Sequence, residues 1–172
     1  NKEGRAIRFN EQTVRTMGRN ATGVRAMRID EGDEVIGMVS VCNPEKDTVL
    51  VVSDQGYGKR SDVEDYRITN RGGKGVKTMN ITDKTGKLVA LKVVNDEDDL
   101  MIINVSGITL RLHTSDIRVM GRATQGVRLI NLSKRGDTIA SICRVPREDE
   151  ENINAETSEA TTEDSDQPEN DN

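Results

Sequence analysis

Aromatic residues are almost missing from this chain. Its 172 residues include no Trp, one Phe and two Tyr, so Val, Ile and Leu must build most of the hydrophobic core. The apolar share is only 33%, and we therefore expect a thin core. The shortage of rings also disfavours a site for single-stranded nucleic acid, because such sites stack successive bases on aromatic side chains.

Long apolar runs and paired cysteines are missing as well. No stretch approaches the roughly 20 apolar residues of a membrane-spanning helix. The opening residues, NKEGRAIRF, contain no apolar signal region and no initial Met, which predicts a fragment of a longer cytoplasmic chain. Cys42 and Cys143 form no CxxC pair and have no His nearby, so we expect two buried, reduced thiols.

Nucleotide-binding and metal-binding motifs are incomplete. The stretch NRGGKG (70–75) is glycine-rich and basic, but a P-loop needs GxxxxGK and then Ser or Thr, between a strand and a helix. GYGKRS (56–61) fails the dinucleotide-binding pattern. DEDD (96–99) lacks the Gly and the distal Glu of a calcium loop, so a solvated hairpin turn is expected there. We predict a non-catalytic chain, with no catalytic residue, no metal site and no cofactor of its own.

The negative net charge of −5 hides two segments of opposite charge. Residues 148–172 hold 11 Asp and Glu and no Lys or Arg, which leaves all 25 cations and 19 of the 30 acids in residues 1–147, a balance of +6. The last segment is poor in apolar residues and rich in like charge, a composition typical of disorder. We expect a mildly basic folded body, 1–147, with a disordered acidic tail, 148–172.

The body contains three copies of one unit. Stretches of 26 residues that begin at Gly4, Gly56 and Gly107 align without a gap, at offsets of 52 and 51. A period near 50 with about four short strands is typical of propeller-like blades, and no window shows the period of a helix. The sequence predicts an all-β fold of about three four-stranded antiparallel blades. The repeats cover about 1–43, 48–95 and 99–145, with strands expected at 34–41, 48–54, 87–94, 99–105 and 138–145.

Aligned positions separate scaffold from surface. Glycine recurs at positions 4/56/107 and 23/75/126, and a third aligned set is Gly18/Asn70/Gly121. Because Gly and Asn both tolerate positive φ, we expect turns with positive φ at each of these three sets. The strand that begins at Val24 and its counterparts breaks strict alternation, which predicts a bulge or bend. Tyr66 shares its position with Val14 and Ile117 and is expected in the core. His113 aligns with polar residues and is expected on a surface strand.

Cations also recur at aligned positions, and no acidic position runs through all three copies. One interpretation is local pairing with scattered carboxylates such as Asp65 and Asp116. The other is a periodic basic rim that contacts phosphates, and duplex DNA fits such a rim because its backbone is a regular row of negative charges. The four basic sets are Arg8/Arg60/Arg111, Arg15/Arg67/Arg118, Arg19/Arg71/Arg122 and Arg25/Lys77/Arg128.

Three long motifs resemble one known family. VRTMGRNATGVRAM, VVSDQGYGKRSDVEDYRITNRGGKGVKT and DEDDLMIINVSGITLRLHTSDIRVMGRATQGVRLI are similar to the C-terminal domain of the A protein of bacterial DNA gyrase, and the resemblance covers residues 1–145. It implies a six-bladed β-pinwheel, of which this chain holds about three blades. It further implies non-specific binding and wrapping of double-stranded DNA on a basic outer rim, in support of ATP-dependent negative supercoiling by the whole type II topoisomerase.

The family's box motif reads Gln-Arg-Arg-Gly-Gly-Lys/Arg-Gly and lies in the first blade. Here residues 69–75 keep only its second half, in an interior repeat, so we expect a degenerate copy in which Arg71 and Lys74 contact phosphates. The resemblance implies DNA, the remainder of gyrase A and the gyrase B protein as partners, in the bacterial cytoplasm, with ATP and Mg used elsewhere in the parent enzyme. The residues expected to bind DNA are Arg8, Arg15, Arg19, Arg25, Lys59, Arg60, Arg67, Arg71, Lys74, Lys77, Arg111, Arg118, Arg122 and Arg128.

Two alternatives remain open from the sequence. One is the C-terminal domain of the homologous protein of topoisomerase IV, whose pinwheel is more degenerate. The other is a propeller-like scaffold for protein partners, which would show little salt-dependent affinity for DNA.

Overall fold

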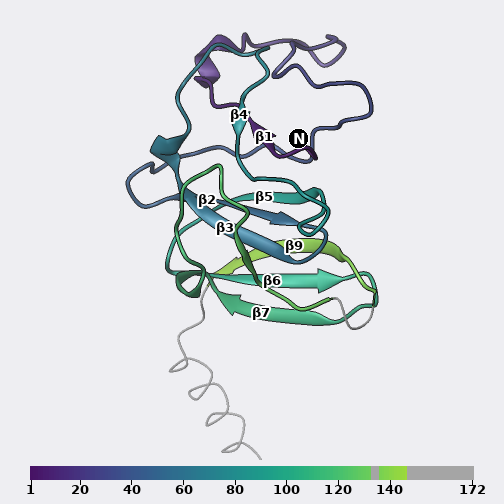
Figure 1. The fold of residues 1–172 in the computed structure, drawn as a ribbon. Helices are drawn as coiled ribbons and strands as arrows, with labels where there is room; N and C mark the ends of the chain where they lie inside the picture. Colours follow the sequence, from purple (N-terminus) through teal and green to yellow (C-terminus); the bar gives the residue numbers. More distant parts are fainter. Residues whose placement is uncertain (133–135, 147–172) are drawn as a thin grey trace, which may run out of the picture.

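The computed structural model describes residues 1–132 and 136–146, so the predicted acidic tail lies outside the described residues. Figure 1 shows three layers, with β1 and β4 at one end, β2, β3 and β5 in the middle, and β6, β7 and β9 at the other end. The elements are β1 (Arg5–Ala6), β2 (Thr48–Ser53), β3 (Tyr57–Asp62), β4 (Val76–Lys77), β5 (Leu88–Val94), β6 (Asp98–Asn104), β7 (Thr109–His113), β8 (Val127–Arg128) and β9 (Ile139–Pro146), with 3-10 turns η1 (Glu11–Thr13), η2 (Val63–Asp65) and η3 (Thr114–Asp116).

The described strands pair antiparallel throughout, and helix is limited to the three short turns, as predicted. The complete sheet has the order β5-β2-β3-β8, and the last sheet has the order β7-β6-β9. Strands β2, β3 and β5 come from the second repeat, but β8 comes from the third. A four-stranded sheet therefore takes three strands from one repeat and its fourth strand from the next.

This exchange of strands forms a junction between successive repeats. At the first junction β4 pairs with β1, and at the second β8 pairs with β3. In both junctions the pairing between the two strands ends after two residues, because the next two backbone N–H groups both donate hydrogen bonds to the same glycine carbonyl. Thr78 and Met79 donate to Gly4, and Leu129 and Ile130 donate to Gly56. The irregularity predicted for these strands is confirmed, and two N–H groups opposite one carbonyl are typical of a bulge.

The strand expected at 34–41 is not formed, and that prediction was wrong. Its counterparts, β5 and β9, pair with β2 and β6, which lead the second and third repeats. No described strand lies in the place of β2 or β6 for the first repeat. Backbone groups of a lone extended segment have no ladder to join, so residues 34–41 run as a loop.

The core lies between the layers, and β2 is buried on both of its faces. Val49 and Val51 belong to the cluster on the side of the first repeat, whereas Leu50 and Val52 belong to the cluster on the side of the third. This alternation follows from the period of two along a strand. Aliphatic side chains fill most of both clusters, which confirms the role predicted for Val, Ile and Leu. Tyr66 is 3% exposed, so its predicted place in the core is also confirmed.

Two further predictions need correction. Both cysteines are exposed rather than buried, and Cys42 and Cys143 line the same shallow hollow beside Lys92. The carbonyl groups of Gly18 and Gly121 each accept a hydrogen bond from the backbone N–H three residues later, so both glycines begin turns as predicted. The positive φ expected for Gly18, Asn70 and Gly121 is absent at all three.

No helix among residues 1–132 and 136–146 is long and apolar enough to cross a bilayer.

Candidate DNA-binding surface

One set of arginines lies on the surface directly after the 3-10 turns. Val14, Tyr66 and Ile117 end these turns in extended conformation, and in the second and third repeats that residue is buried in the core. Because successive side chains of an extended chain point to opposite sides, the next residue points outward. Arg15, Arg67 and Arg118 occupy this place. All three are exposed, and none makes a side-chain hydrogen bond or ion pair with a described residue.

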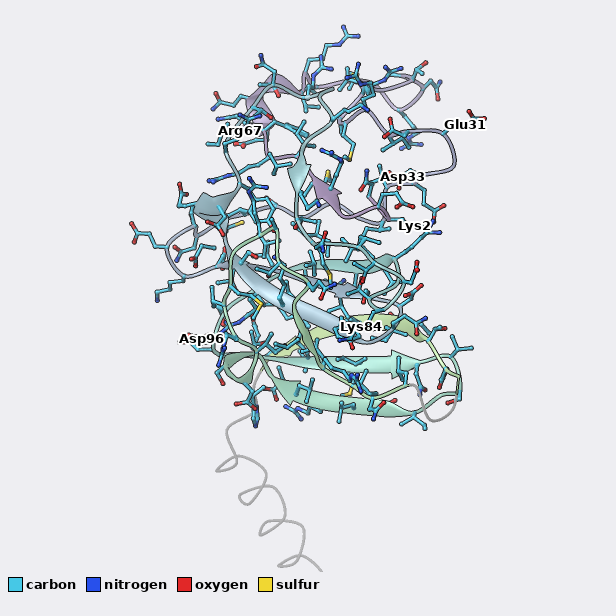
Figure 2. The ribbon with its side chains drawn as sticks, in the orientation of Figure 1. Lys2, Glu31, Asp33, Arg67, Lys84 and Asp96 are labelled. Carbon is cyan, nitrogen blue, oxygen red and sulfur yellow. The ribbon has the colours of Figure 1, made fainter. Side chains whose placement is uncertain are left out.

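Figure 2 places Arg67 on one side of the upper layers, with Lys2, Glu31 and Asp33 on the other side. The guanidinium group of Arg67 therefore lies away from the acidic turn around Asp33. An unpaired arginine keeps all its donors for an incoming phosphate, and it can bind two phosphate oxygens at once. This set fits the predicted basic rim best.

The set Arg8/Arg60/Arg111 has a different place, and its assignment to the rim is corrected. Arg60 is only 5% exposed; its Nε donates to the carbonyl of Ile117 over 2.8 Å and its Nη1 to Asp96 over 2.5 Å. Arg8 makes the equivalent contacts one repeat earlier, to the carbonyls of Val63 and Tyr66 at 3.0 and 3.2 Å. Both side chains fasten the 3-10 turn of the next repeat, so they act within the scaffold.

Arg111, the third member, has no following repeat among the described residues. Its Nε donates to Asp99 over 2.7 Å, and Nδ1 of His113 lies 2.6 Å from the other oxygen of the same carboxylate. These partners, with the hydrogen bond to His113 as the larger cause, lower the pKa of Asp99. Arg111 is thus partly neutralised. His113 lies half-exposed at the end of β7, as predicted.

The DEDD stretch is only in part the solvated hairpin turn that we expected, because its exposed turn joins strands β5 and β6 of two different sheets. Asp98 and Asp99 are buried at the start of β6, and only Asp96 and Glu97 are exposed. Asp98 accepts from the backbone N–H of Asn95 over 2.8 Å and closes the turn that leads from β5 to β6. Three of the four carboxylates pair with cations, since Asp96 faces Arg60, Asp98 faces Arg144, and Asp99 faces Arg111. These acids therefore balance structural cations.

Lys59 is fully buried and cannot reach DNA, so its assignment to the rim was wrong. Its Nζ donates to the carbonyl of Gly121 over 2.7 Å and to Oγ of Ser61 over 3.2 Å. Burial lowers the pKa of Lys59 from 10.5 to about 8. The sequence did contain one sign that this position is buried, because the aligned residues in the other two repeats are the apolar Ile7 and Leu110.

The remaining two basic sets lie around the junctions. Arg71 donates to the carbonyl of Arg25 over 3.4 Å, and Arg122 donates to that of Lys77 over 2.8 Å, so each reaches back to the preceding repeat. The side chains of Arg19 and Arg25 make no hydrogen bond or ion pair with a described residue. Lys77 donates to Asn80 over 3.2 Å. These residues keep free donors and remain candidates for phosphate contacts.

Part of the degenerate box, Thr69, Asn70 and residues 73–75, lines a shallow hollow together with Arg8 and Arg67. Gly75 has φ of 73° and lies so close to β1 that a Cβ would stand 2.3 Å from the carbonyl oxygen of Ala6. This glycine is therefore required by the junction. Lys74 forms an exposed ion pair with Asp30 at 3.0 Å, and Arg71 makes only long bonds to backbone carbonyls. Both cations stay accessible to a phosphate.

One basic cluster was missed when the repeats were compared by sequence. Arg128 donates to the hydroxyl of Tyr57 over 3.1 Å and stacks on its ring at 5.6 Å, and Lys84 approaches the same ring at 5.7 Å. The hydrogen bond from Arg128 is the main cause that lowers the pKa of Tyr57. Lys84 aligns with Gly32 in the first repeat and with Arg135 in the third, so a cation recurs at this position in only two of the three repeats.

Stacked antiparallel sheets made from copies of one unit, with an exposed arginine after each 3-10 turn, define a propeller-like repeat domain with a basic edge. Residues 1–42, 47–95 and 98–145 match the family described as DNA gyrase C-terminal domain, beta-propeller, and the chain belongs to that family. The predicted resemblance is confirmed.

One relative in sequence and two solved structures are similar to this chain. The gyrase A protein of Staphylococcus aureus (strain NCTC 8325 / PS 47) is 45% identical over 158 residues, which are 91% of this chain and 18% of the relative. A solved DNA gyrase A C-terminal domain is 28% identical with a TM-score of 0.76, over 83% of this chain and 48% of that one. The C-terminal domain of DNA topoisomerase IV, at 21% identity and a TM-score of 0.79 over 94% and 50%, shares the fold.

Proposed function

We propose that this chain binds duplex DNA without sequence preference and guides it around its basic edge. The observation that carries the proposal is the position of Arg15, Arg67 and Arg118, which are exposed, unpaired with described residues and repeated once per layer. Cations repeated at a fixed spacing contact successive phosphates of a curved duplex, and contacts to the backbone alone carry no sequence information.

The chain spans about a fifth of the length of the gyrase A protein that it matches, so the wider role is also proposed. We infer that it works as the C-terminal part of a gyrase A protein in the bacterial cytoplasm, together with the remainder of that protein and with gyrase B. The curved DNA would be presented to the cleavage domain of the parent type II topoisomerase, and cleavage and ATP hydrolysis with Mg would take place outside this chain.

A salt titration tests the binding. A fluorescent duplex is titrated with the chain at several salt concentrations, once with a mixed sequence and once with a scrambled sequence of the same length. We expect equal affinities for both sequences and a logarithmic salt slope of about −0.9 for each neutralised phosphate. An affinity that hardly changes with salt, or that follows the base sequence, would contradict the proposal and favour a scaffold for protein partners.

A further inference from the structure

Tyr57 stands at a position where the other repeats have no aromatic ring. It directly follows Gly56, and the aligned residues are Arg5 in the first repeat and Ile108 in the third. Its side chain belongs to the core cluster on the side of the first repeat and is 9% exposed. Its backbone is held as well, because Oγ of Ser53 donates to its carbonyl over 3.2 Å and accepts from its N–H over 3.3 Å. The ring therefore has a fixed position.

Arg128 is brought to this ring by the pairing of strands from two repeats. Strand β8 pairs with β3 so that Arg128 lies directly opposite Tyr57. Its Nη2 donates to the tyrosine hydroxyl over 3.1 Å, and its guanidinium carbon lies 5.6 Å from the ring centroid, within the range over which aromatic rings attract cations. Arg128 is exposed and forms no ion pair with a described carboxylate, so most of its donors stay available.

Lys84 reaches the same ring from a turn of the second repeat, beside the middle layer of strands (Figure 2). Oγ1 of the fully buried Thr85 accepts from the N–H of Thr82 over 2.9 Å and holds this turn. Nε2 of Gln125 donates to Oγ1 of Thr82 over 3.2 Å and ties the turn to the segment before β8. The ammonium of Lys84 lies 5.7 Å from the ring centroid and forms no ion pair with a described carboxylate. Two cations from different repeats are thus held at one ring.

The three side chains together suit an anion that only accepts hydrogen bonds. The hydroxyl oxygen of Tyr57 accepts from Arg128, so its own proton is free to donate, and the two cations are donors only. Like charges repel at this distance, and an anion between them removes the repulsion. The hydrogen bond from Arg128 is the main cause that lowers the pKa of Tyr57, and the charge of Lys84 adds to it, so negative charge is favoured here. A phosphate group fits, because its oxygens take several donors at once.

We propose that Tyr57, Lys84 and Arg128 bind one backbone phosphate of a duplex, in addition to the phosphates bound by the exposed arginines after the 3-10 turns. This inference rests on the proposed binding function and adds a second kind of contact to it. The exposed arginines recur in every repeat, whereas only the second repeat has a ring after the glycine. Because phosphate contacts fix the register of a duplex on a protein, this site gives one fixed point to an otherwise periodic edge.

Two substitutions in the complete chain test the site with a fluorescent duplex. Lys84→Ala should weaken binding about tenfold and reduce the logarithmic salt slope by up to about 0.9. Lys87→Ala is the matched control, because it removes the same charge nearby but from a lysine that already pairs with Glu3 at 2.7 Å. Tyr57→Phe keeps the ring and its attraction for both cations, so we expect about threefold weaker binding at an unchanged salt slope.

The outcomes separate this site from the proposed function. Equal effects of Lys84→Ala and Lys87→Ala, or normal affinity of Tyr57→Phe, overturn the site while the original chain still binds duplex with a steep salt dependence. If the original chain binds no duplex at any salt concentration, the proposed function itself fails.

A fluorine label on the tyrosines separates phosphate binding from a role in folding. The chain has two tyrosines, so 3-fluorotyrosine gives two fluorine resonances in the nuclear magnetic resonance spectrum, and Tyr57→Phe assigns them. We expect added duplex to move the resonance of Tyr57 and to leave that of Tyr66, which is 3% exposed. Inorganic phosphate, at the concentration of the duplex phosphates, should move neither. A Tyr57 resonance that stays in place with saturating duplex, or that moves equally with inorganic phosphate, overturns the proposal.

Discussion

Nε of Arg60 donates a hydrogen bond to the carbonyl of Ile117 over 2.8 Å, and Arg118, the next residue, is exposed and unpaired with any described side chain. The same two neighbouring positions recur in the junction before it, where Arg8 bonds the carbonyl of Tyr66 and Arg67 points outward. A buried arginine therefore fixes the turn from which an exposed arginine projects. We therefore expect substitution of the buried arginines to lower the stability of the fold, and substitution of the exposed arginines to lower the affinity for DNA.

Arg60→Ala removes charged hydrogen bonds and leaves the carbonyl of Ile117 unpaired in a buried place. We expect the free energy of unfolding to fall by about 2–3 kcal/mol. Arg118→Ala is the matched control, with the same loss of charge and an expected change within about 0.5 kcal/mol. Urea denaturation measures both. A stable Arg60→Ala variant would place this side chain on the rim after all.

The triple variant Arg15→Ala, Arg67→Ala and Arg118→Ala should weaken binding to every duplex sequence. Each lost phosphate contact removes about 0.9 from the logarithmic salt slope, so we expect the slope to shrink by about 3. The charge-matched control changes Lys2, Lys46 and Lys87 to Ala; Lys2 lies away from Arg67 (Figure 2). The two triple variants are compared by fluorescence anisotropy. Equal losses would mean that only net charge matters.

Arg71→Ala with Lys74→Ala should also weaken DNA binding across all sequences, with little change in melting temperature. An exposed ion pair such as that of Lys74 with Asp30 contributes about 0–1 kcal/mol. Asp30→Asn is the informative control, because it frees Lys74, and we expect it to bind DNA at least as tightly as the original chain. A large drop in melting temperature with normal DNA affinity would show that both cations serve the fold.

Lys59 gives the stability a pH dependence. Its pKa is lowered by burial from 10.5 to about 8, so between these values the unfolded chain binds more protons than the folded chain. The stability contributed at this site is therefore lowest below about pH 8 and rises as the pH increases toward 10.5. We expect the chain to gain on the order of 1–2 kcal/mol relative to Lys59→Met from about pH 7 to pH 10.

Urea denaturation at several pH values measures this difference, with Lys46→Met as the exposed control. A constant difference between the chain and Lys59→Met would mean that Lys59 keeps an ordinary pKa.

Removal of residues 148–172 should strengthen DNA binding. The deletion changes the formal charge from −5 to +6, and a tethered acidic segment competes for cations at an effective concentration on the order of millimolar. We expect the largest gain at low salt, because screening weakens the competition. Fluorescence anisotropy at low and moderate salt compares both lengths. Equal affinities at both salts would leave the tail without an effect on binding.

Local patterns in the amino-acid order were enough to predict the repeats, the all-β class and the positions at which cations recur. Glycines mark turns where φ is positive, apolar residues alternate along strands, and one unit is copied at a fixed period. Tyr66 could be placed in the core and His113 on a surface strand from their aligned neighbours alone.

The exposure of each cation, in contrast, depends on how the repeats pack. Arg8 and Arg15 recur with the same regularity, yet Arg8 meets the carbonyls of the next repeat and Arg15 meets none. Lys59 resembled a rim residue, but the third repeat covers it and supplies a carbonyl for its ammonium. The strand expected at 34–41 did not form for the reverse reason, since no described strand pairs with it. A repeat determines its own turns, but burial and pairing depend on the neighbour that packs against it.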